Sequence, residues 1–303
     1  MAVQTRDPYA VPGDYRKVQL HCHTTESDGR FRPAELLRMY KKAGYTFVFI
    51  TDHNRVTRCD ALDDETFLAL PGTEDTVSAL RPLGPHLLRL FVGESLRGRD
   101  AQGYIDRTET AGGLCGLCHP SWTGNLWTGA WPIDAVAALR GYHLVEICNP
   151  HSRPADDVVR WQAALRRPRA APAWGVAVDD CHGRAQFNRA WIVARVPRMT
   201  ADDLRRALRA GAFYASTGPA AAFAVRGTTI TARFEEPMAM RFIDAQGRVR
   251  MAVEGADGGY PVRGDEQYIR VEAARGRYAV WSQPFAIKED PLAGVDGDRF
   301  GHS

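Results

Sequence analysis

Two histidines and an aspartate near the start of the chain have the spacing of a metal site. Residues 18–23 alternate apolar and polar side chains, a period of two that predicts a strand. Side chains two apart on a strand share a face, so His21 and His23 point the same way. A polar turn then brings Asp28 close behind them. Two neutral imidazoles and a carboxylate are typical transition-metal ligands, although a polar strand terminus is the alternative.

More ligand-type side chains follow apolar runs further along the chain. Taken with the first three, the groups at predicted strand ends are His21, His23, Asp28, His53, Glu74, His119, Asp180 and His182. So many imidazoles and carboxylates at one edge of a sheet would repel one another, or be buried without hydrogen-bond partners, unless cations neutralised them. The sequence therefore predicts a site that holds several metal ions.

The elements that position these groups alternate between strands and helices. Amphipathic or capped stretches predict helices over 34–43, 100–111, 132–141, 155–166 and 201–210. Thr200 is suited to cap the last of these helices, and Gly211 is suited to end it. Strands alternating with helices predict a mainly parallel sheet, and polar groups at most strand ends predict an α/β barrel with one active face.

The pattern changes after residue 218. No helical period appears between about 220 and 287, and short alternating runs are separated by Gly, Pro and Asp. This pattern predicts an antiparallel β domain. We therefore expect a barrel over 1–218, a small β-sandwich-like domain over 219–290, and a disordered tail over 291–303.

Composition narrows the class of protein. The chain has 303 residues, 45% of them hydrophobic and 25% charged, with a net charge of +3. It has no apolar run of the roughly 18 residues that cross a membrane and no apolar signal-peptide core. We expect a cytoplasmic protein that does not bind membranes. The cluster Arg160, Arg166, Arg167 and Arg169 is expected to be a solvated helix end, so nucleic acid is not an expected partner except as a short nucleotide substrate.

The six cysteines are scattered and lie mostly in apolar runs, which favours reduced, buried thiols over a disulfide framework. Cys115, Cys118 and His119 together match the haem-attachment pattern C-x-x-C-H. Haem attachment normally requires export, and the sequence shows no export signal. A redox pair is the remaining alternative, but both cysteines fall within a predicted strand. His119 therefore fits a metal-ligand role better.

The strand-end motifs occur in an order that resembles the PHP (polymerase and histidinol phosphatase) family. They are His21-x-His23 with Ser27-Asp28-Gly29, Thr51-Asp52-His53-Asn54, Gly72-x-Glu74, His119-Pro120 and Asp180-x-His182. The resemblance covers about 17–218. It implies a distorted (β/α)7 TIM-like barrel that holds two or three divalent ions, which we expect to be Mn, Zn or Fe. The stretch Phe213–Pro219 and the β-rich end are similar to the CehA/McbA-type branch.

The resemblance also implies which residues hold each ion. The three implied sets are His21, His23, Glu74 and Asp180; Glu74, His86 and His119; and Asp28, His53 and His182. Glu74 would bridge two ions, and Glu74 and Asp180 are the expected catalytic residues. His86 is implied because the family often has a histidine at the start of the strand after Gly-x-Glu. Its alternative is a polar loop residue.

Metal chemistry predicts the reaction. A hydroxide shared by bridged ions attacks a phosphorus atom without a Ser or Cys nucleophile, so the expected function is hydrolysis of a small phosphate mono- or diester. Arg184, Arg55 and Asn149 are the expected substrate contacts, although each Arg could equally lie on the surface. Asn149 and Glu146 end a predicted strand at the same face, where they could orient the metal ligands or contact the leaving group. The tryptophans at 122, 127 and 131 predict a loop over the site, or else core packing. The alternatives are a carbamate or aryl ester hydrolase and a non-catalytic metal-binding interaction module.

Overall fold

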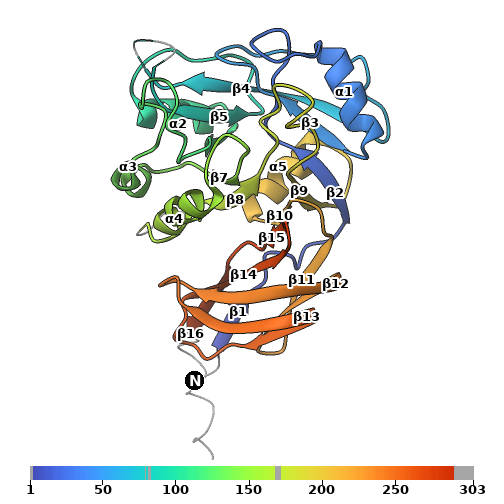
Figure 1. The fold of residues 1–303 in the computed structure, drawn as a ribbon, viewed down its shortest axis with the longest axis vertical. Coiled ribbons are helices and arrows are strands. Elements are labelled where there is room, and N and C mark those ends of the chain that lie inside the picture. The colour runs from blue at the N-terminus through green and yellow to red at the C-terminus, as the bar shows by residue number, and fades with distance from the viewer. Residues whose placement is uncertain (1–2, 79, 81–82, 168–171, 290–303) are drawn as a thin grey trace, which may run out of the picture. The chain divides into compact units, whose positions relative to one another are not determined.

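A computed structural model of the chain describes residues 3–78, 80, 83–167 and 172–289 (Figure 1). They form two units: one spans Val11–Gly218, and the other joins Met1–Ala10 to Pro219–Ser303. The first ten residues therefore fall outside the larger unit, contrary to the predicted 1–218 boundary. The reason is non-local pairing, because strand β1 (Val3–Arg6) runs antiparallel to β16 (Phe285–Glu289). The predicted disordered tail, 291–303, lies outside the described residues.

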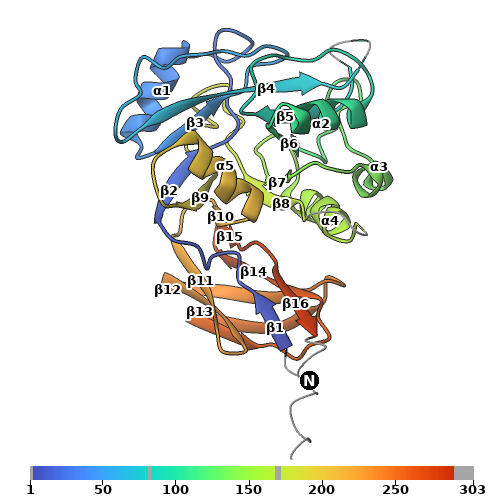
Figure 2. The same cartoon turned by 180° about the vertical axis from the view of Figure 1, so that it is seen from behind.

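The larger unit is a mixed α/β structure built on a long sheet (Figures 1 and 2). In spatial order its strands are β10 (Phe213–Ser216), β9 (Trp191–Val196), β2 (Asp14–Gln19), β3 (Phe47–Ile50), β4 (Leu68–Thr76), β5 (His86–Leu90), β6 (Leu114–Leu117), β7 (Leu144–Cys148) and β8 (Trp174–Ala177). Its helices are α1 (Pro33–Lys42), α2 (Ala101–Thr110), α3 (Ile133–Ala138), α4 (Pro154–Leu165) and α5 (Ala201–Ala210). The structure confirms a helix at each place where the sequence predicts one, although α3 is shorter than expected.

Strand direction explains how a histidine at a strand start joins the same edge as the strand ends. The pairs β2–β3, β3–β4, β6–β7 and β7–β8 are parallel, as expected. Strand β5 runs antiparallel to both β4 and β6. A parallel connection needs a crossover of a dozen or more residues, and the link over 77–85 is shorter than that. The amino end of β5, which carries His86, therefore lies beside the carboxyl ends of its neighbours.

At this edge, backbone bridges join segments that follow different strands of the sheet. Cys22, just after β2, pairs in parallel with Cys181, just after β8. The backbone N–H of His23 donates to the carbonyl oxygen of Cys181 over 3.0 Å. A second parallel bridge joins His53 to Glu74, so their side chains are anchored to adjacent backbones. This pairing fixes the spacing between ligand-type residues that are far apart in sequence.

Local sequence signals account for the helices that brace the sheet. Pro33 begins α1, which buries Leu36, Leu37 and Tyr40. Thr200 caps α5 by accepting from the backbone N–H of Asp203. The same helix ends at a left-handed glycine, residue 211, whose φ is +74°. These residues set the two ends of α5, and the helix packs against β9.

The smaller unit is built from antiparallel pairs. Its further strands are β11 (Ala221–Arg226), β12 (Thr229–Asp244), β13 (Val249–Pro261), β14 (Tyr268–Arg275) and β15 (Tyr278–Trp281). Strand β12 pairs antiparallel with β11, β13 and β14. The two short runs that the sequence predicts within 228–243 form this single long strand, with an irregularity between Arg233 and Met238.

The arginine cluster near α4 is partly structural. The Arg167 side chain is buried, lies 3.8 Å from the ring centre of Tyr142 and donates to the carbonyl of Leu139. Arg160 donates to the carbonyl of Trp131. Arg169 lies outside the described residues. Within the described part of the chain, no helix is both long and apolar enough to cross a membrane.

Candidate metal centre

The first predicted ligand set forms a tight, buried group. The Nε2 atoms of His21 and His23 lie 3.1 Å apart, and both face one oxygen of Glu74 at 3.2 and 3.1 Å. The Oδ1 atom of Asp180 is 3.3 and 3.1 Å from the same two nitrogens. Ligands about 2.1 Å from one divalent ion are separated by about 3.0–3.4 Å in octahedral or tetrahedral geometry. The four atoms therefore have the spacing of a single coordination sphere.

The second predicted set surrounds the other oxygen of Glu74. The Nδ1 atom of His86 lies 2.8 Å from Oε1, and the Nε2 atom of His119 lies 2.9 Å from it. Both imidazoles are buried. One carboxylate thus presents a separate oxygen to each of two histidine groups. This is the arrangement expected of a carboxylate that bridges two ions.

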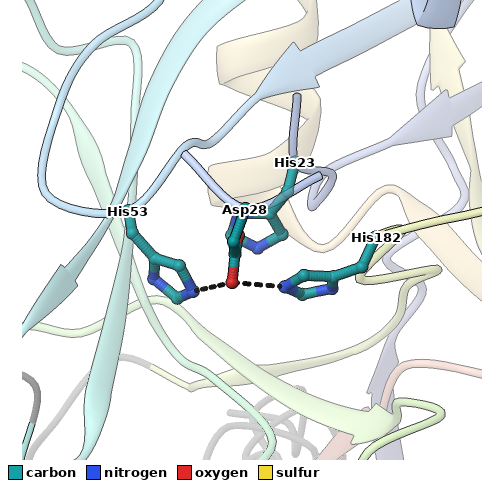
Figure 3. Close-up of side chains that lie close together, drawn as sticks. All are labelled: His23, Asp28, His53 and His182. Atoms are coloured by element: carbon teal, nitrogen blue, oxygen red, sulfur yellow. Dashed lines mark ion pairs between the residues drawn. The ribbon is translucent and has the colours of Figure 1, made fainter. Parts of the chain in front are cut away.

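The third predicted set lies at the outer side of the same group (Figure 3). The Oδ2 atom of Asp28 is 3.5 Å from Nε2 of His53 and 3.3 Å from Nε2 of His182. The other ring nitrogen of His53 lies 3.1 Å from the Glu74 oxygen that faces His21 and His23, so this imidazole reaches both the first and the third set. Asp28 is half-exposed, whereas Glu74 is buried. Figure 3 shows His23 behind Asp28, and His23 is fully buried.

Electrostatics couples these groups to proton binding. Burial alone would raise the pKa of Glu74, but the surrounding histidines, His86 foremost, hold that pKa well below its ordinary value. Burial alone would lower the pKa of His23, but Asp180 and Glu74 outweigh it and raise the pKa to about 9. Protons occupy this cluster when cations do not, so metal binding must release them.

Two buried atoms show that the donor set suits cations. Within the described residues, the Nδ1 atom of His119 and the Oδ1 atom of Asp180 are buried and accept or donate no hydrogen bond. Both residues also have positive φ, +25° and +42°. Unpaired buried polar atoms and left-handed backbone at non-glycine residues both cost free energy. The Oδ1 atom of Asp180 lies beside His21 and His23 without a hydrogen bond to either, and a metal ion bound among them would satisfy it. The residues present therefore fit the predicted ions.

Glu146 and Asn149 support the ligands from behind. One oxygen of Glu146 lies 2.6 Å from Nδ1 of His21, and the other accepts the backbone N–H of His119. The amide nitrogen of Asn149 donates to Glu146 and, over 3.0 Å, to Asp180. Asn149 is buried, and its side-chain amide oxygen accepts the backbone N–H of residue 151. The predicted substrate contact at Asn149 therefore has the geometry of a residue that orients ligands.

Asp52 orders the turn that carries Asp28. Its buried carboxylate accepts hydrogen bonds from the backbone and hydroxyl of Thr24, and from the hydroxyls of Ser27 and Thr57. These contacts hold the 24–28 turn between the first and third ligand sets. The motif Thr51-Asp52-His53 thus contributes one candidate ligand and one structural carboxylate.

A pocket of about 420 Å³ opens onto the site. It is lined by Asp28, His53, Asn54, Glu74, Thr76, His86, His119, Trp122, Asn125, His151, Asp180 and His182. The sequence reasoning missed His151, whose Nε2 atom lies 3.4 Å from the backbone oxygen of Asp180. His151 follows Asn149 in a loop, and the only signal for it is that it lies two residues beyond a polar strand end.

The two predicted arginine contacts lie outside this pocket. Arg55 forms an ion pair with Glu26 at 2.9 Å and is half-exposed. Arg184 is exposed. Among the described residues, no Arg or Lys lines the pocket. Positive charge at the site would therefore come from bound ions and imidazoles.

The three predicted loop tryptophans have three different environments. Trp122 lines the pocket, with its ring centre 4.7 Å from that of His119. Trp131 is buried and donates to the backbone carbonyl of His86 over 3.1 Å. Trp127 is 82% exposed. The prediction of a loop over the site is therefore correct for Trp122, and the alternative of core packing is correct for Trp131.

The cysteines are all free thiols. Cys115 and Cys118 are buried, and burial raises the pKa of Cys115 to about 12. Burial also raises the pKa of Cys118 well above its ordinary value. Thiols in this state are weak nucleophiles, which argues against a redox role for the C-x-x-C pattern.

No protein-family model and no curated protein matches the chain. Among solved structures, a two-domain protein from Bacteroides vulgatus containing a predicted PHP-like metal-dependent phosphoesterase aligns with 93% of this chain and 91% of its own, at 15% identity and a TM-score of 0.51. A candidate metal-dependent phosphoesterase from Bifidobacterium adolescentis covers 66% of this chain and 98% of its own, at 15% identity and a TM-score of 0.44. An amidohydrolase from Chromobacterium violaceum covers 55% and 87%, at 14% identity and a TM-score of 0.37. The first of these likenesses shows a shared fold.

Proposed function

We propose that this protein is a metal-dependent phosphoesterase that hydrolyses a small phosphate mono- or diester. The observation that carries the proposal is the double-sided Glu74 carboxylate. One of its oxygens faces His21 and His23, and the other faces His86 and His119, all within 3.2 Å. The bridge between Cys22 and Cys181 joins the segments that follow β2 and β8, which supports the distorted (β/α)7 TIM-like barrel that the PHP resemblance implies. The assignment to the CehA/McbA-like branch is part of this proposal and rests on the sequence resemblance alone.

The donor set fits two or three divalent ions, with Mn, Zn or Fe suited to its imidazoles and carboxylates. Bound there, the ions would supply a hydroxide at neutral pH and stabilise negative charge on the phosphoryl oxygens. Glu74 holds the first two sets at a fixed separation. Asp180 is oriented by Asn149, and Glu146 fixes which nitrogen of His21 faces the site.

The protein side chains themselves then bind and position rather than attack. The buried Cys118 beside the site stays protonated, so it is not an available nucleophile. Asp28, His53 and His182 line the pocket at its exposed side, where the substrate enters. These three residues would hold a third ion, which would add positive charge at this side of the pocket.

Substrate charge favours phosphate over carbamate. A phosphoryl transition state spreads negative charge over several oxygens, and a site with three cations matches that charge. A carbamate needs one Lewis acid and one hydroxide, which leaves the third ligand set without a task. One observation favours the carbamate alternative: no Arg or Lys among the described residues lines the pocket, and a neutral substrate needs none.

Hydrolysis rates decide between these functions. Under saturating Mn²⁺, kcat/KM for p-nitrophenyl phosphate and bis-p-nitrophenyl phosphate is compared with kcat/KM for a naphthyl carbamate. We expect a higher value for a phosphate ester. A carbamate value about tenfold higher, which is about 1.4 kcal/mol of barrier, would reverse the assignment. A fully metal-loaded protein that hydrolyses none of them would instead favour the non-catalytic module.

A further inference from the structure

The pocket has one apolar wall. Apart from the predicted metal ligands and His151, its described lining consists of Asn54, Thr76, Trp122 and Asn125. Asn54 and Thr76 are committed to each other, since the asparagine amide both accepts from and donates to the threonine. Trp122 is therefore the lining side chain that offers a large apolar face.

The Trp122 indole is held rigidly in this position. Its ring contacts His119 edge-on at an interplanar angle of 70°, and its centre lies 5.4 Å from that of His86. Gly124 and Gly129 leave space for the indole: a Cβ atom at either position would come within 2.0 and 2.5 Å of it, respectively. A fixed aromatic face beside two candidate ligands is preorganised for stacking.

The turn that follows carries two exposed apolar side chains on a strained backbone. Asn125, Leu126 and Trp127 have φ values of +53°, +54° and +71°. Leu126 is 79% exposed and Trp127 is 82% exposed. Left-handed backbone at non-glycine residues is unfavourable, and exposed apolar surface adds nothing to folding. Such features persist where the surrounding structure enforces them and are concentrated at ligand sites.

Hydrogen bonds fix the turn against the metal centre. The amide nitrogen of Asn125 lies 3.2 Å from Nε2 of His86 and 3.4 Å from the carbonyl oxygen of Gly84. The hydroxyl of Thr128 accepts the backbone N–H of Gly84 over 2.8 Å. The turn thus contacts the candidate ligand His86 through Asn125, and it also carries the exposed side chains of Leu126 and Trp127.

We propose that Trp122, with the Leu126–Trp127 tip as its rim, determines specificity by binding a flat, uncharged group on the substrate. The inference rests on the proposed function, because it assigns the part of a phosphate ester that extends away from the ions. The pocket lining supports an uncharged group, since its described residues include no Arg or Lys and the wall itself is apolar. Stacking on the indole selects a planar group over a small alkyl group.

Binding of non-hydrolysable phosphonates tests this proposal without relying on turnover. The Mn²⁺-loaded protein is titrated by calorimetry with phenylphosphonate and methylphosphonate, and the ratio of the two Kd values is measured. We expect phenylphosphonate to bind about tenfold more tightly. Trp122→Leu should reduce this ratio about fivefold or more. Val159→Ser, at an exposed apolar residue of α4, is the matched control and should not change it.

The tip is tested separately. The double variant Leu126→Ser/Trp127→Ser should remove the additional affinity that 1-naphthylphosphonate has over phenylphosphonate, and it decides the question if Trp122→Leu fails to fold or to hold metal. Equal Kd values for phenyl- and methylphosphonate in the wild-type protein would overturn the inference. Ester hydrolysis combined with an unchanged ratio in both variants would overturn it too, leaving the proposed function intact. Phenylphosphonate binding that depends on Trp122, without hydrolysis of any ester, would support the role of Trp122 in binding a planar group. It would refute the proposed phosphoesterase activity.

Discussion

Glu74→Gln should remove metal and catalysis together. The substitution keeps the side-chain volume but removes the charge that five imidazole nitrogens approach within 3.2 Å. At an effective dielectric constant of 20, one unit charge about 4 Å from another contributes about 4 kcal/mol. Loss of that interaction at a bridged pair of ions corresponds to a decrease of about 10³-fold in kcat/KM. We expect the metal content to fall by at least one ion per chain.

Two measurements check this expectation: elemental analysis after metal-replete purification, and kcat/KM for p-nitrophenyl phosphate. Glu109→Gln is the matched control. Glu109 lies on α2, is partly exposed and forms an ion pair with Arg209, so its loss should leave metal content and rate unchanged. A Glu74→Gln protein with wild-type metal content and wild-type rate would refute the bridging role.

The other predictions follow from the groups around the ligands. Because His23 keeps its proton below a pH of about 9, Mn²⁺ affinity should rise with pH up to about 9, by about tenfold per pH unit for each proton released; calorimetry showing a pH-independent Kd would contradict this. Asn149→Ala should weaken metal affinity by about 10–100-fold, because it leaves Asp180 unsupported, whereas an increase in KM at full metal occupancy would show instead that Asn149 binds substrate. Arg184→Ala should change KM for p-nitrophenyl phosphate by no more than about twofold, since the side chain is exposed and outside the pocket lining; a large rise in KM would restore the substrate contact that the sequence suggests. Gly211→Ala should lower the free energy of unfolding by about 1–3 kcal/mol, because φ is +74° and a Cβ atom would lie 2.8 Å from the indole of residue 174; urea unfolding at the wild-type midpoint would argue otherwise.

Local signals made part of the fold predictable. The hydroxyl of Thr200 and the left-handed Gly211 define the limits of α5, and both act within one helical turn. The candidate ligands were recognisable for a similar reason. His21 and His23 follow β2 closely, and Glu74 lies near the carboxyl end of β4, so sequence position determines at which edge of the sheet they lie.

Non-local pairing was not predictable in this way. The antiparallel direction of β5, which brings His86 to the ligand edge, depends on which strands it pairs with and not on its own apolar pattern. Strand β1 belongs to the smaller unit because it pairs with β16, which lies near the other end of the sequence. Loops determine that the Arg55 side chain pairs with Glu26 and that His151 lines the pocket. The conformation of a loop cannot be predicted from short-range sequence periodicity.

Metal occupancy and phosphate release, measured on the same samples, test the central claim most directly. The purified protein is treated with a chelator, reloaded stepwise with Mn²⁺, and assayed at each step for bound metal by elemental analysis and for hydrolysis of p-nitrophenyl phosphate. The proposed function predicts two to three ions per chain at saturation, no hydrolysis without metal, and hydrolysis that returns as the sites fill. Binding of less than one ion per chain, or hydrolysis that is unaffected by removing the metal, would contradict the account.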